Sequence, residues 1–278
     1  MFSQRPTWCP GCGNWSIHMA IKKALAESGL ALEEAFIVFG IGCSGNMNDF
    51  LDNYSMHGLH GRSIANAVGL KMANHKKKVI VMAGDGDTYG EGGNHLLHAC
   101  RGNHDLKLFV HDNHLYGLTT GQVSPTSKKG MISKSTPQGM IDNSFDPLSL
   151  ALTQGATFVA QAFAGDVPAL IVIMKEAIAH KGFAIVNILQ PCVTFDKVMT
   201  YKFYLERIFS LPAEHDRENL AMALSLVMKA REEEKFPIGV LYQKEKATYT
   251  GEHANLKTET LLDKKRYTDF KTLMAEFR

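Results

Sequence analysis

Short apolar runs alternate with amphipathic segments along roughly the first two thirds of the chain. Five of the runs predict buried strands, because each is mainly apolar and ends at glycine, proline or polar residues. They are residues 36–39, 79–83, 106–110, 157–161 and 183–189. Helical periodicity is found between them, at residues 14–28, 62–74, 91–101 and 167–180. Strands that alternate with helices in this way predict an α/β fold, with a mostly parallel sheet and helices on both faces.

The chain changes character after about residue 195. Between residues 200 and 278 charged residues become denser, and the pattern predicts only a helix at 217–234 and a short strand at 238–242. We therefore expect a main domain at residues 1–199 and a C-terminal extension at 200–278 that packs on a partner subunit. Residues 124–143 are rich in Ser, Gly, Pro and Lys, which predicts a long loop that covers a site or grips a partner.

Composition and charge are those of a globular protein that binds neither nucleic acid nor a membrane. Of the 278 residues, 45% are hydrophobic and 21% are charged, and the formal net charge is +2. This balance lacks the basic surplus typical of nucleic-acid binding, and no apolar stretch approaches the roughly 18 residues of a membrane span. The start of the chain, Met1 to Pro6, lacks the apolar core of a signal peptide, so we expect a cytoplasmic protein.

The first candidate for a functional site is the motif Gly84-Asp85-Gly86-Asp87, which directly follows the apolar run 79–83. A glycine beside an aspartate is a common turn, but Asn113 follows a second predicted strand, 28 positions after Asp85. In open α/β sheets the carboxyl ends of such strands bind ligands. The glycines let the backbone approach a diphosphate, while Asp85 and Asn113 offer one anionic and one neutral oxygen to Mg²⁺. The pattern predicts a site for a metal ion and a diphosphate.

Four of the five cysteines form a second signal. Cys9 and Cys12 stand in a Cys-Pro-Gly-Cys sequence, and Cys43 and Cys192 each follow a predicted strand. Four thiolates can hold either structural zinc or an iron–sulfur cluster. Zinc ribbons usually bring two local Cys-x-x-Cys pairs, whereas two of these cysteines are single and distant in sequence. Cys100 lies within a helical pattern, which favours a buried free thiol outside the site.

The two signals occur together in one family. Gly-Asp-Gly followed by Asn just under thirty residues later resembles the thiamin diphosphate motif. The chain from about Arg5 to Phe195 is similar to the β subunits of 2-oxoacid:ferredoxin oxidoreductases. The segments that carry this resemblance, in order, are Trp8–Gly13, Gly40–Gly45, His57–Arg62, Gly84–Asp87 and Tyr116–Gln122. The resemblance implies a thiamin diphosphate-binding fold with a C-terminal extension.

The resemblance also implies cofactors and ligands. It assigns a [4Fe-4S] cluster to Cys9, Cys12, Cys43 and Cys192. It assigns Mg²⁺ to Asp85, Asn113 and the carbonyl group of Leu115. Thiamin diphosphate contacts are implied for Ile41, Gly42, Ser44, Gly84, Gly86, Asp87, Gly117 and Leu118. His60 is a further binding candidate because it lies in a glycine-rich segment before a predicted helix, although an ordinary loop would explain it equally well.

By resemblance, the chain is the β subunit of an enzyme that oxidatively decarboxylates a 2-oxoacid to acyl-CoA and CO₂ and passes electrons through the cluster to ferredoxin. The activating glutamate and much of the coenzyme A surface are expected on an α subunit, in an αβ or α₂β₂ assembly, so the chain alone should be inactive. Some archaeal members carry lysines where this chain has Asn46 and Thr120. We favour 2-oxoglutarate as the substrate, with pyruvate as the main rival. A non-oxidative thiamin diphosphate decarboxylase with structural zinc, or a non-catalytic zinc module, stays open at this point.

Overall fold

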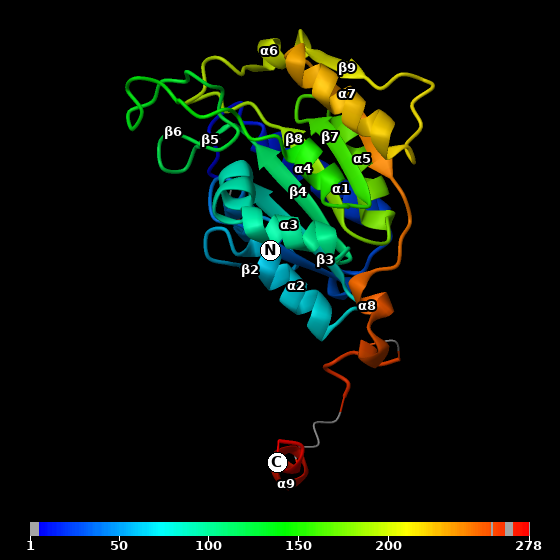
Figure 1. Ribbon diagram of the computed structural model, residues 1–278. Helices are drawn as coiled ribbons and strands as arrows, with labels where there is room; N and C mark the ends of the chain where they lie inside the picture. Colours follow the sequence, from blue (N-terminus) through cyan, green and yellow to red (C-terminus); the bar gives the residue numbers. More distant parts are fainter. Residues whose placement is uncertain (1–5, 257, 265–268, 278) are drawn as a thin grey trace.

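An eight-stranded sheet with the strand order β2-β1-β3-β4-β8-β7-β10-β9 runs through the protein (Figure 1). The computed structural model describes residues 6–256, 258–264 and 269–277. Strand bounds in the sheet are β1 Ala35–Phe39, β2 Tyr54–His57, β3 Lys78–Gly84, β4 Leu106–Asp112, β7 Phe158–Phe163, β8 Ala184–Leu189, β9 Ile208–Ser210 and β10 Phe236–Gln243. Neighbouring strands are parallel except for β7 and β10. The prediction of a mostly parallel sheet is confirmed.

Helices cover both faces of this sheet, which explains why its central strands are apolar on both sides. One face packs against α1 Asn14–Glu27 and α5 Val167–Ala179, through buried residues such as Ile21 and Met174. The opposite face packs against α2 Ser63–Ala73, α3 Gly93–Arg101, α4 Pro147–Thr153 and α7 Leu220–Glu232. Phe109 and Val110, adjacent on β4, belong to the two different cores. Each large apolar side chain buried in this way stabilises the fold by about 1.5–3 kcal/mol.

Short elements lie between the main ones. η1 Leu32–Glu34 directly precedes β1, and the others follow the carboxyl ends of strands: η2 Gly45–Asp49, η3 Gly86–Glu91, β5 Leu115–Tyr116, β6 Gln122–Val123 and α6 Tyr201–Leu205. β5 and β6 form a separate antiparallel pair. The predicted helix at 91–101 begins at Gly93, because the residues just after β3 form the π-helical turn η3. Such turns are frequent at functional sites.

The C-terminal part requires a correction. Residues 208–243 contribute β9, α7 and β10 to the main body, and β10 pairs with β7 in antiparallel register, with Val240 opposite Ala160. The boundary at residue 199 therefore does not separate the body from an extension. One side of α7, including Val227, packs into the core.

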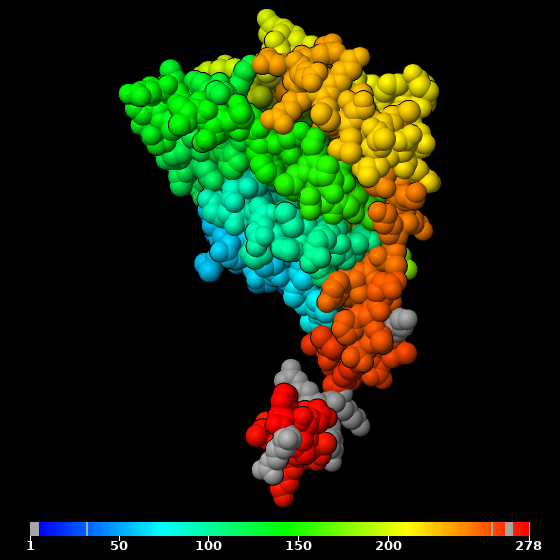
Figure 2. Space-filling model, viewed as in Figure 1, coloured from blue at the N-terminus to red at the C-terminus, as the bar shows by residue number. Residues whose placement is uncertain are grey.

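After β10 the chain crosses the amino ends of the strands. Asn103 donates hydrogen bonds to the carbonyl groups of Lys246 and Ala247, which fixes the segment before α8 Tyr249–Glu252 and η4 Ala254–Leu256. The last helix, α9 Phe270–Ala275, lies apart from the body in Figures 1 and 2, where it is the red segment. Phe270 and Met274 on this helix are exposed. Packing of this segment on a partner subunit remains a proposal.

None of the helices in the described parts of the chain combines the length and the apolar composition needed to cross a membrane. The signal-peptide expectation rests on Met1 to Pro6, of which Met1 to Arg5 lie outside the described residues.

Candidate functional site

A cavity of about 90 Å³ opens at the carboxyl ends of β1, β3 and β4. The connections that leave β1 and β3 run in opposite directions along the sheet, since β2 lies beyond β1 and β4 beyond β3. Open α/β sheets bind ligands at such a switch point. The structure brings all twelve residues that were predicted for thiamin diphosphate and Mg²⁺ to this one cavity. They are Ile41, Gly42, Ser44, His60, Gly84, Asp85, Gly86, Asp87, Asn113, Leu115, Gly117 and Leu118.

Asp85 lies at the end of β3 and is almost completely buried. The hydroxyl groups of Ser124 and Thr126 donate hydrogen bonds to its Oδ2 atom, at 2.5 and 2.7 Å. Both bonds fall on one oxygen, so these hydroxyl groups leave Oδ1 to a cation. Burial, followed by the nearby carboxyl group of Asp112, raises the pKa of Asp85 to about 6.

Asn113 and Leu115 complete a set of hard oxygen ligands. The Oδ1 atom of Asn113 accepts a hydrogen bond from the backbone nitrogen of Leu115 at 3.1 Å, which fixes the amide relative to the following strand. Carboxylate, amide and carbonyl oxygens are the ligands that Mg²⁺ takes in phosphate sites. Ser44, also at the cavity, has a buried hydroxyl group without a hydrogen-bond partner in the described chain. These donors and acceptors fit a magnesium ion with a diphosphate.

Asp87 organises the loops around the cavity. Its Oδ1 atom accepts hydrogen bonds from the backbone nitrogens of Ile41 and Gly61, at 3.1 and 2.8 Å. The hydroxyl group of Ser63 donates to Oδ2 at 2.7 Å, and Nδ1 of His60 lies 3.0 Å from Oδ1. Because the chain's own donors occupy this carboxylate, Asp87 acts by positioning the loop after β1 and the start of α2.

Two glycines at the cavity are required by geometry. Gly42 has a φ of +131°, a backbone conformation that other residues rarely adopt. A Cβ atom on Gly86 would collide with the ring of Tyr116. That ring also lines the cavity, so the absence of a side chain at Gly86 lets it approach the turn after β3.

The four predicted cysteines come from three segments that hydrogen bonds hold together. The backbone nitrogen of Gly13 donates to the carbonyl of Pro191 at 3.3 Å, and Nε1 of Trp8 donates to the carbonyl of Cys43 at 2.7 Å. Burial, and then the other three thiol groups, raise the pKa of Cys43 to about 12. Cys43 also lines the cavity at the carboxyl ends of β1, β3 and β4, hereafter the cofactor cavity. The cysteine group and the cavity therefore share a residue.

The individual cysteines differ in their surroundings. Cys9 is exposed, Cys12 is buried, and Cys43 and Cys192 are intermediate. Burial raises the pKa of Cys12, and the neighbouring thiols of Cys192 and Cys9 add to the shift. Within the described ranges, no three His, Cys, Asp or Glu side chains are arranged to hold a single metal ion. Cys100 is buried in α3, as expected for a free thiol in a helix.

Four further residues line the cofactor cavity and were not predicted: His111, Tyr116, Thr119 and Gln190. Burial lowers the pKa of His111 to about 3, so its imidazole is neutral at physiological pH. Its Nδ1 atom bonds Asn14 Oδ1 at 2.7 Å, while Nε2 is buried without a partner in the described residues. His111 lies on β4, two residues before Asn113, which directly follows the strand, so strand periodicity was a signal that could have identified it.

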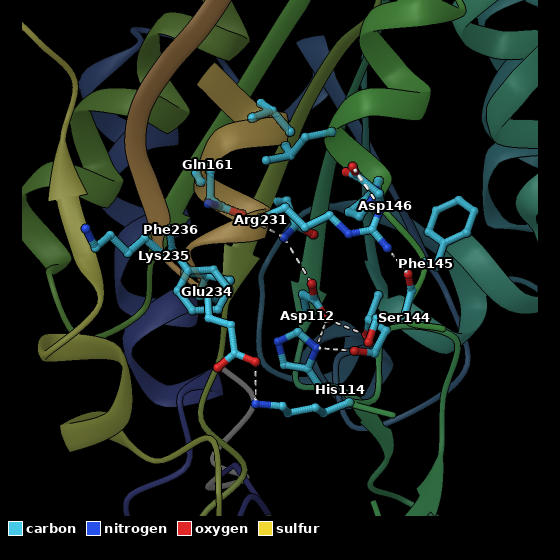
Figure 3. A pocket seen from close by; sticks show the side chains of 18 of the residues that line it. Asp112, His114, Ser144, Phe145, Asp146, Gln161, Arg231, Glu234, Lys235 and Phe236 are labelled. Atoms are coloured by element: carbon cyan, nitrogen blue, oxygen red, sulfur yellow. Dashed lines mark hydrogen bonds and ion pairs between the residues drawn. The ribbon is translucent and has the colours of Figure 1, made fainter. Parts of the chain in front are cut away.

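A second cavity, of about 420 Å³, lies beside the first at the ends of β4, β7 and β8 (Figure 3). Its inner wall contains the buried polar residues Asp112, Gln161 and Asn187. At its rim Arg231 extends from α7 toward Asp146, and their ion pair measures 3.3 Å. No sequence pattern pointed to this cavity.

Comparisons with known proteins agree with this geometry. Residues 40–188 match the family model described as "Thiamine pyrophosphate enzyme, C-terminal TPP binding domain". Residues 192–258 match a second model, which describes the C-terminal part of the pyruvate ferredoxin oxidoreductase beta chain.

Individual relatives were also found. The chain is 41% identical over 252 residues to a 2-oxoacid:ferredoxin oxidoreductase subunit beta from Saccharolobus solfataricus, covering 86% of this chain and 82% of the relative. It is 45% identical over 193 residues to the 2-oxoglutarate oxidoreductase subunit KorB of Mycobacterium tuberculosis, covering 69% of this chain and 52% of that protein. A solved 2-oxoglutarate:ferredoxin oxidoreductase from Magnetococcus marinus, with 2-oxoglutarate, coenzyme A and succinyl-CoA bound, superposes with a TM-score of 0.91 at 39% identity. That match covers 99% of this chain and 94% of the solved one.

Proposed function

The chain belongs to the β subunits of the 2-oxoacid:ferredoxin oxidoreductases, and from this premise we propose that it binds Mg²⁺–thiamin diphosphate in the smaller cavity and a [4Fe-4S] cluster on its four grouped cysteines. The proposed reaction is the oxidative decarboxylation of 2-oxoglutarate to acyl-CoA and CO₂, with electrons passed to ferredoxin. Bound thiamin diphosphate supplies the decarboxylation chemistry, and the cluster supplies one-electron transfer.

The position of Cys43 is the observation that carries the proposal. Its side chain lines the cavity that takes the cofactor, and its thiol belongs to the group formed by the other three cysteines. The sulfur lies 3.4 Å from the point that a Cβ on Gly117 would occupy, at the wall of the cavity. Cys43 would therefore hold the proposed cluster directly at the wall of the cavity that would take the cofactor.

Within the cavity we assign Mg²⁺ to Asp85, Asn113 and the carbonyl of Leu115, because they offer three oxygen ligands around one space. The unpartnered hydroxyl group of Ser44 is suited to donate a hydrogen bond to a phosphate oxygen. His60 lines the same cavity, and its ring is held by Asp87 at Nδ1 and lies 3.5 Å from Glu91 at Nε2, so we propose it as a binding residue through its position at the cavity wall.

The choice of 2-oxoglutarate rests on the two relatives that act on or hold it, from M. tuberculosis and M. marinus. Thr120 and Asn46 replace the lysines of some archaeal members, so a distal carboxylate would have to be held by other cations. Arg62, two residues after the cavity residue His60, and residues of the α partner are candidates. Pyruvate, which has no distal carboxylate, is the alternative substrate.

The partner proposed for this chain is an α subunit that supplies the activating glutamate and the coenzyme A surface. Exposed apolar side chains of the last helix, Phe270, Leu273 and Met274, are proposed to pack on it. The five cysteines are free thiols, which suits the reducing conditions of the cytoplasm.

The test is anaerobic co-purification of this chain with its α partner, followed by assay of coenzyme A-dependent reduction of a low-potential dye. Reduction with 2-oxoglutarate in preference to pyruvate is the expected result. Preference for pyruvate would overturn the substrate assignment while keeping the reaction class. No reduction with any 2-oxoacid, in a complex that contains iron and thiamin diphosphate, would overturn the proposed reaction.

A further inference from the structure

Gln190 is a buried residue that connects the cofactor cavity with the cysteine group. It directly follows β8, and only 1% of its surface is exposed. The side chain lines the cavity, and its Nε2 atom lies 3.4 Å from the sulfur of Cys12. The Gln190 side chain therefore contacts the cavity proposed to hold thiamin diphosphate, the electron donor. It also contacts Cys12, a ligand of the proposed cluster, the electron acceptor.

The position of this side chain is fixed on two sides. The backbone nitrogen of Gln190 donates to the carbonyl group of Asp112 at 2.9 Å, which ties it to the end of β4. A Cβ atom on Gly13 would lie 2.5 Å from Cγ of Gln190, so the glutamine stem occupies the space that a side chain there would need. Gln190 is thus packed against the backbone that follows Cys12.

The polarity of the contact follows from the chemistry of the two groups. A metal-bound thiolate can only accept a hydrogen bond, so the amide nitrogen is the end of the glutamine that faces Cys12. The Oε1 atom is buried and has no partner in the described chain. Hydrogen bonds to cluster sulfurs are among the features by which a protein sets the reduction potential.

We infer that Gln190 is a positioning residue that raises the reduction potential of the cluster through its hydrogen bond to Cys12. The inference rests on the proposed function, because it requires a cluster on the four cysteines. Reduction adds one electron to the cluster and makes its sulfur ligands more electron-rich. A donor aimed at one of them stabilises the reduced state more than the oxidised state. The hydrogen bond therefore favours electron acceptance from the cofactor side of the cavity.

The experiment is a redox titration of the anaerobically purified αβ complex, followed by the electron paramagnetic resonance signal of the reduced cluster. Gln190→Met keeps the length of the side chain and removes the donor. We expect it to retain the iron content of the wild-type complex and to shift the midpoint potential to a more negative value. Gln161→Met is the matched control, because Gln161 is also a buried glutamine but donates to the carbonyl of Pro237. Its midpoint should equal that of the wild type.

A second variant guards against loss of folding. Gln190→Leu replaces the amide with an apolar side chain that cannot donate and adds no charge, so its shift should also be negative. An intact cluster with a wild-type midpoint in either variant would overturn the role of Gln190 alone. A wild-type complex that contains no iron would overturn the proposed cluster, and this inference with it. The two failures are therefore distinguishable.

Discussion

The hydroxyl group of Thr126 donates a hydrogen bond of 2.7 Å to the buried carboxylate of Asp85. The same hydroxyl lies 2.8 Å from Oδ1 of Asp112, a residue that lines the larger cavity. Thr126 comes from the long loop after β6, whose sequence predicted a segment covering a site. This loop therefore shapes the cofactor cavity by orienting the carboxylate proposed to bind Mg²⁺.

Removal of this hydroxyl should weaken metal binding. Thr126→Val conserves the shape of the side chain but leaves Asp85 with one of its two hydroxyl donors. We expect about 10- to 100-fold weaker Mg²⁺ binding in the presence of thiamin diphosphate, as is typical when a partner of a metal ligand is lost. Isothermal titration of the αβ complex measures it. Thr153→Val is the control, because Thr153 is exposed and donates to backbone carbonyls of α4. Equal Mg²⁺ affinities in the two variants would contradict the assignment of Asp85 as a Mg²⁺ ligand.

Replacement of the ligand itself should have a larger effect. Asp85→Ala is expected to abolish Mg²⁺-dependent binding of thiamin diphosphate, because the anionic member of the ligand set is lost. The cofactor retained by the αβ complex after gel filtration provides the measurement. Asp142→Ala, in an exposed part of the long loop, should retain the cofactor fully. Retention of cofactor by Asp85→Ala would place the ion elsewhere.

Gly86 gives a steric test of the cavity. Gly86→Ala drives a methyl group into the ring of Tyr116, so we expect reduced cofactor occupancy and a loss of stability of about 1–3 kcal/mol. The double variant Gly86→Ala, Tyr116→Ala should recover part of both losses. As a control, Gly69 lies in α2 with open space around it, so Gly69→Ala should be neutral or stabilising by roughly 0.5–1 kcal/mol. Thermal unfolding and the thiamin content of each complex provide the measurements.

His180 predicts a pH dependence of stability. It follows α5, its Nε2 lies 2.9 Å from the hydroxyl of Thr157, and burial, with a smaller effect of Lys107, lowers its pKa to about 4. The unfolded chain gains this proton near pH 6.5, whereas the folded chain stays neutral until about pH 4. Stability from this group is therefore present above pH 6.5 and is lost as the pH falls toward 4.

The measurement is the melting temperature of the αβ complex between pH 7.5 and pH 5. His180→Gln cannot take up the proton, so its melting temperature should fall less over this range than that of the wild type. Parallel curves for the two proteins would show that His180 does not titrate on unfolding.

The cofactor cavity could be predicted from the sequence because its residues lie in short motifs at strand ends. Gly84 to Asp87 and Asn113 each follow an apolar strand, and parallel strands bring such ends to one edge. Cys12 and Cys192 were grouped by resemblance, and the structure brings their loops together through Gly13 and Pro191. Local motifs were sufficient for the cavity, whereas the grouping of the cysteines came from the family resemblance.

Contacts formed by tertiary packing were missed. Gln190 looks like an ordinary residue after a strand, and its contact with Cys12 depends on a close approach at Gly13 that no local pattern encodes. The sequence pattern placed β10 outside the main body. Its pairing with β7 depends on a free edge of the sheet, which local strand propensity does not encode. The larger cavity likewise arises where α7 and the long loop cover the sheet.

The central claim is that the cofactor cavity and the cysteine group act as one electron-transfer unit joined at Cys43. It is tested most directly by freezing the anaerobic αβ complex after mixing with 2-oxoglutarate and coenzyme A, without an acceptor, and recording its electron paramagnetic resonance spectrum. We expect the signal of a reduced [4Fe-4S] cluster in the wild type, and no such signal in Asp85→Ala. A complex that contains thiamin diphosphate and iron but gives no cluster reduction with any 2-oxoacid would contradict the account.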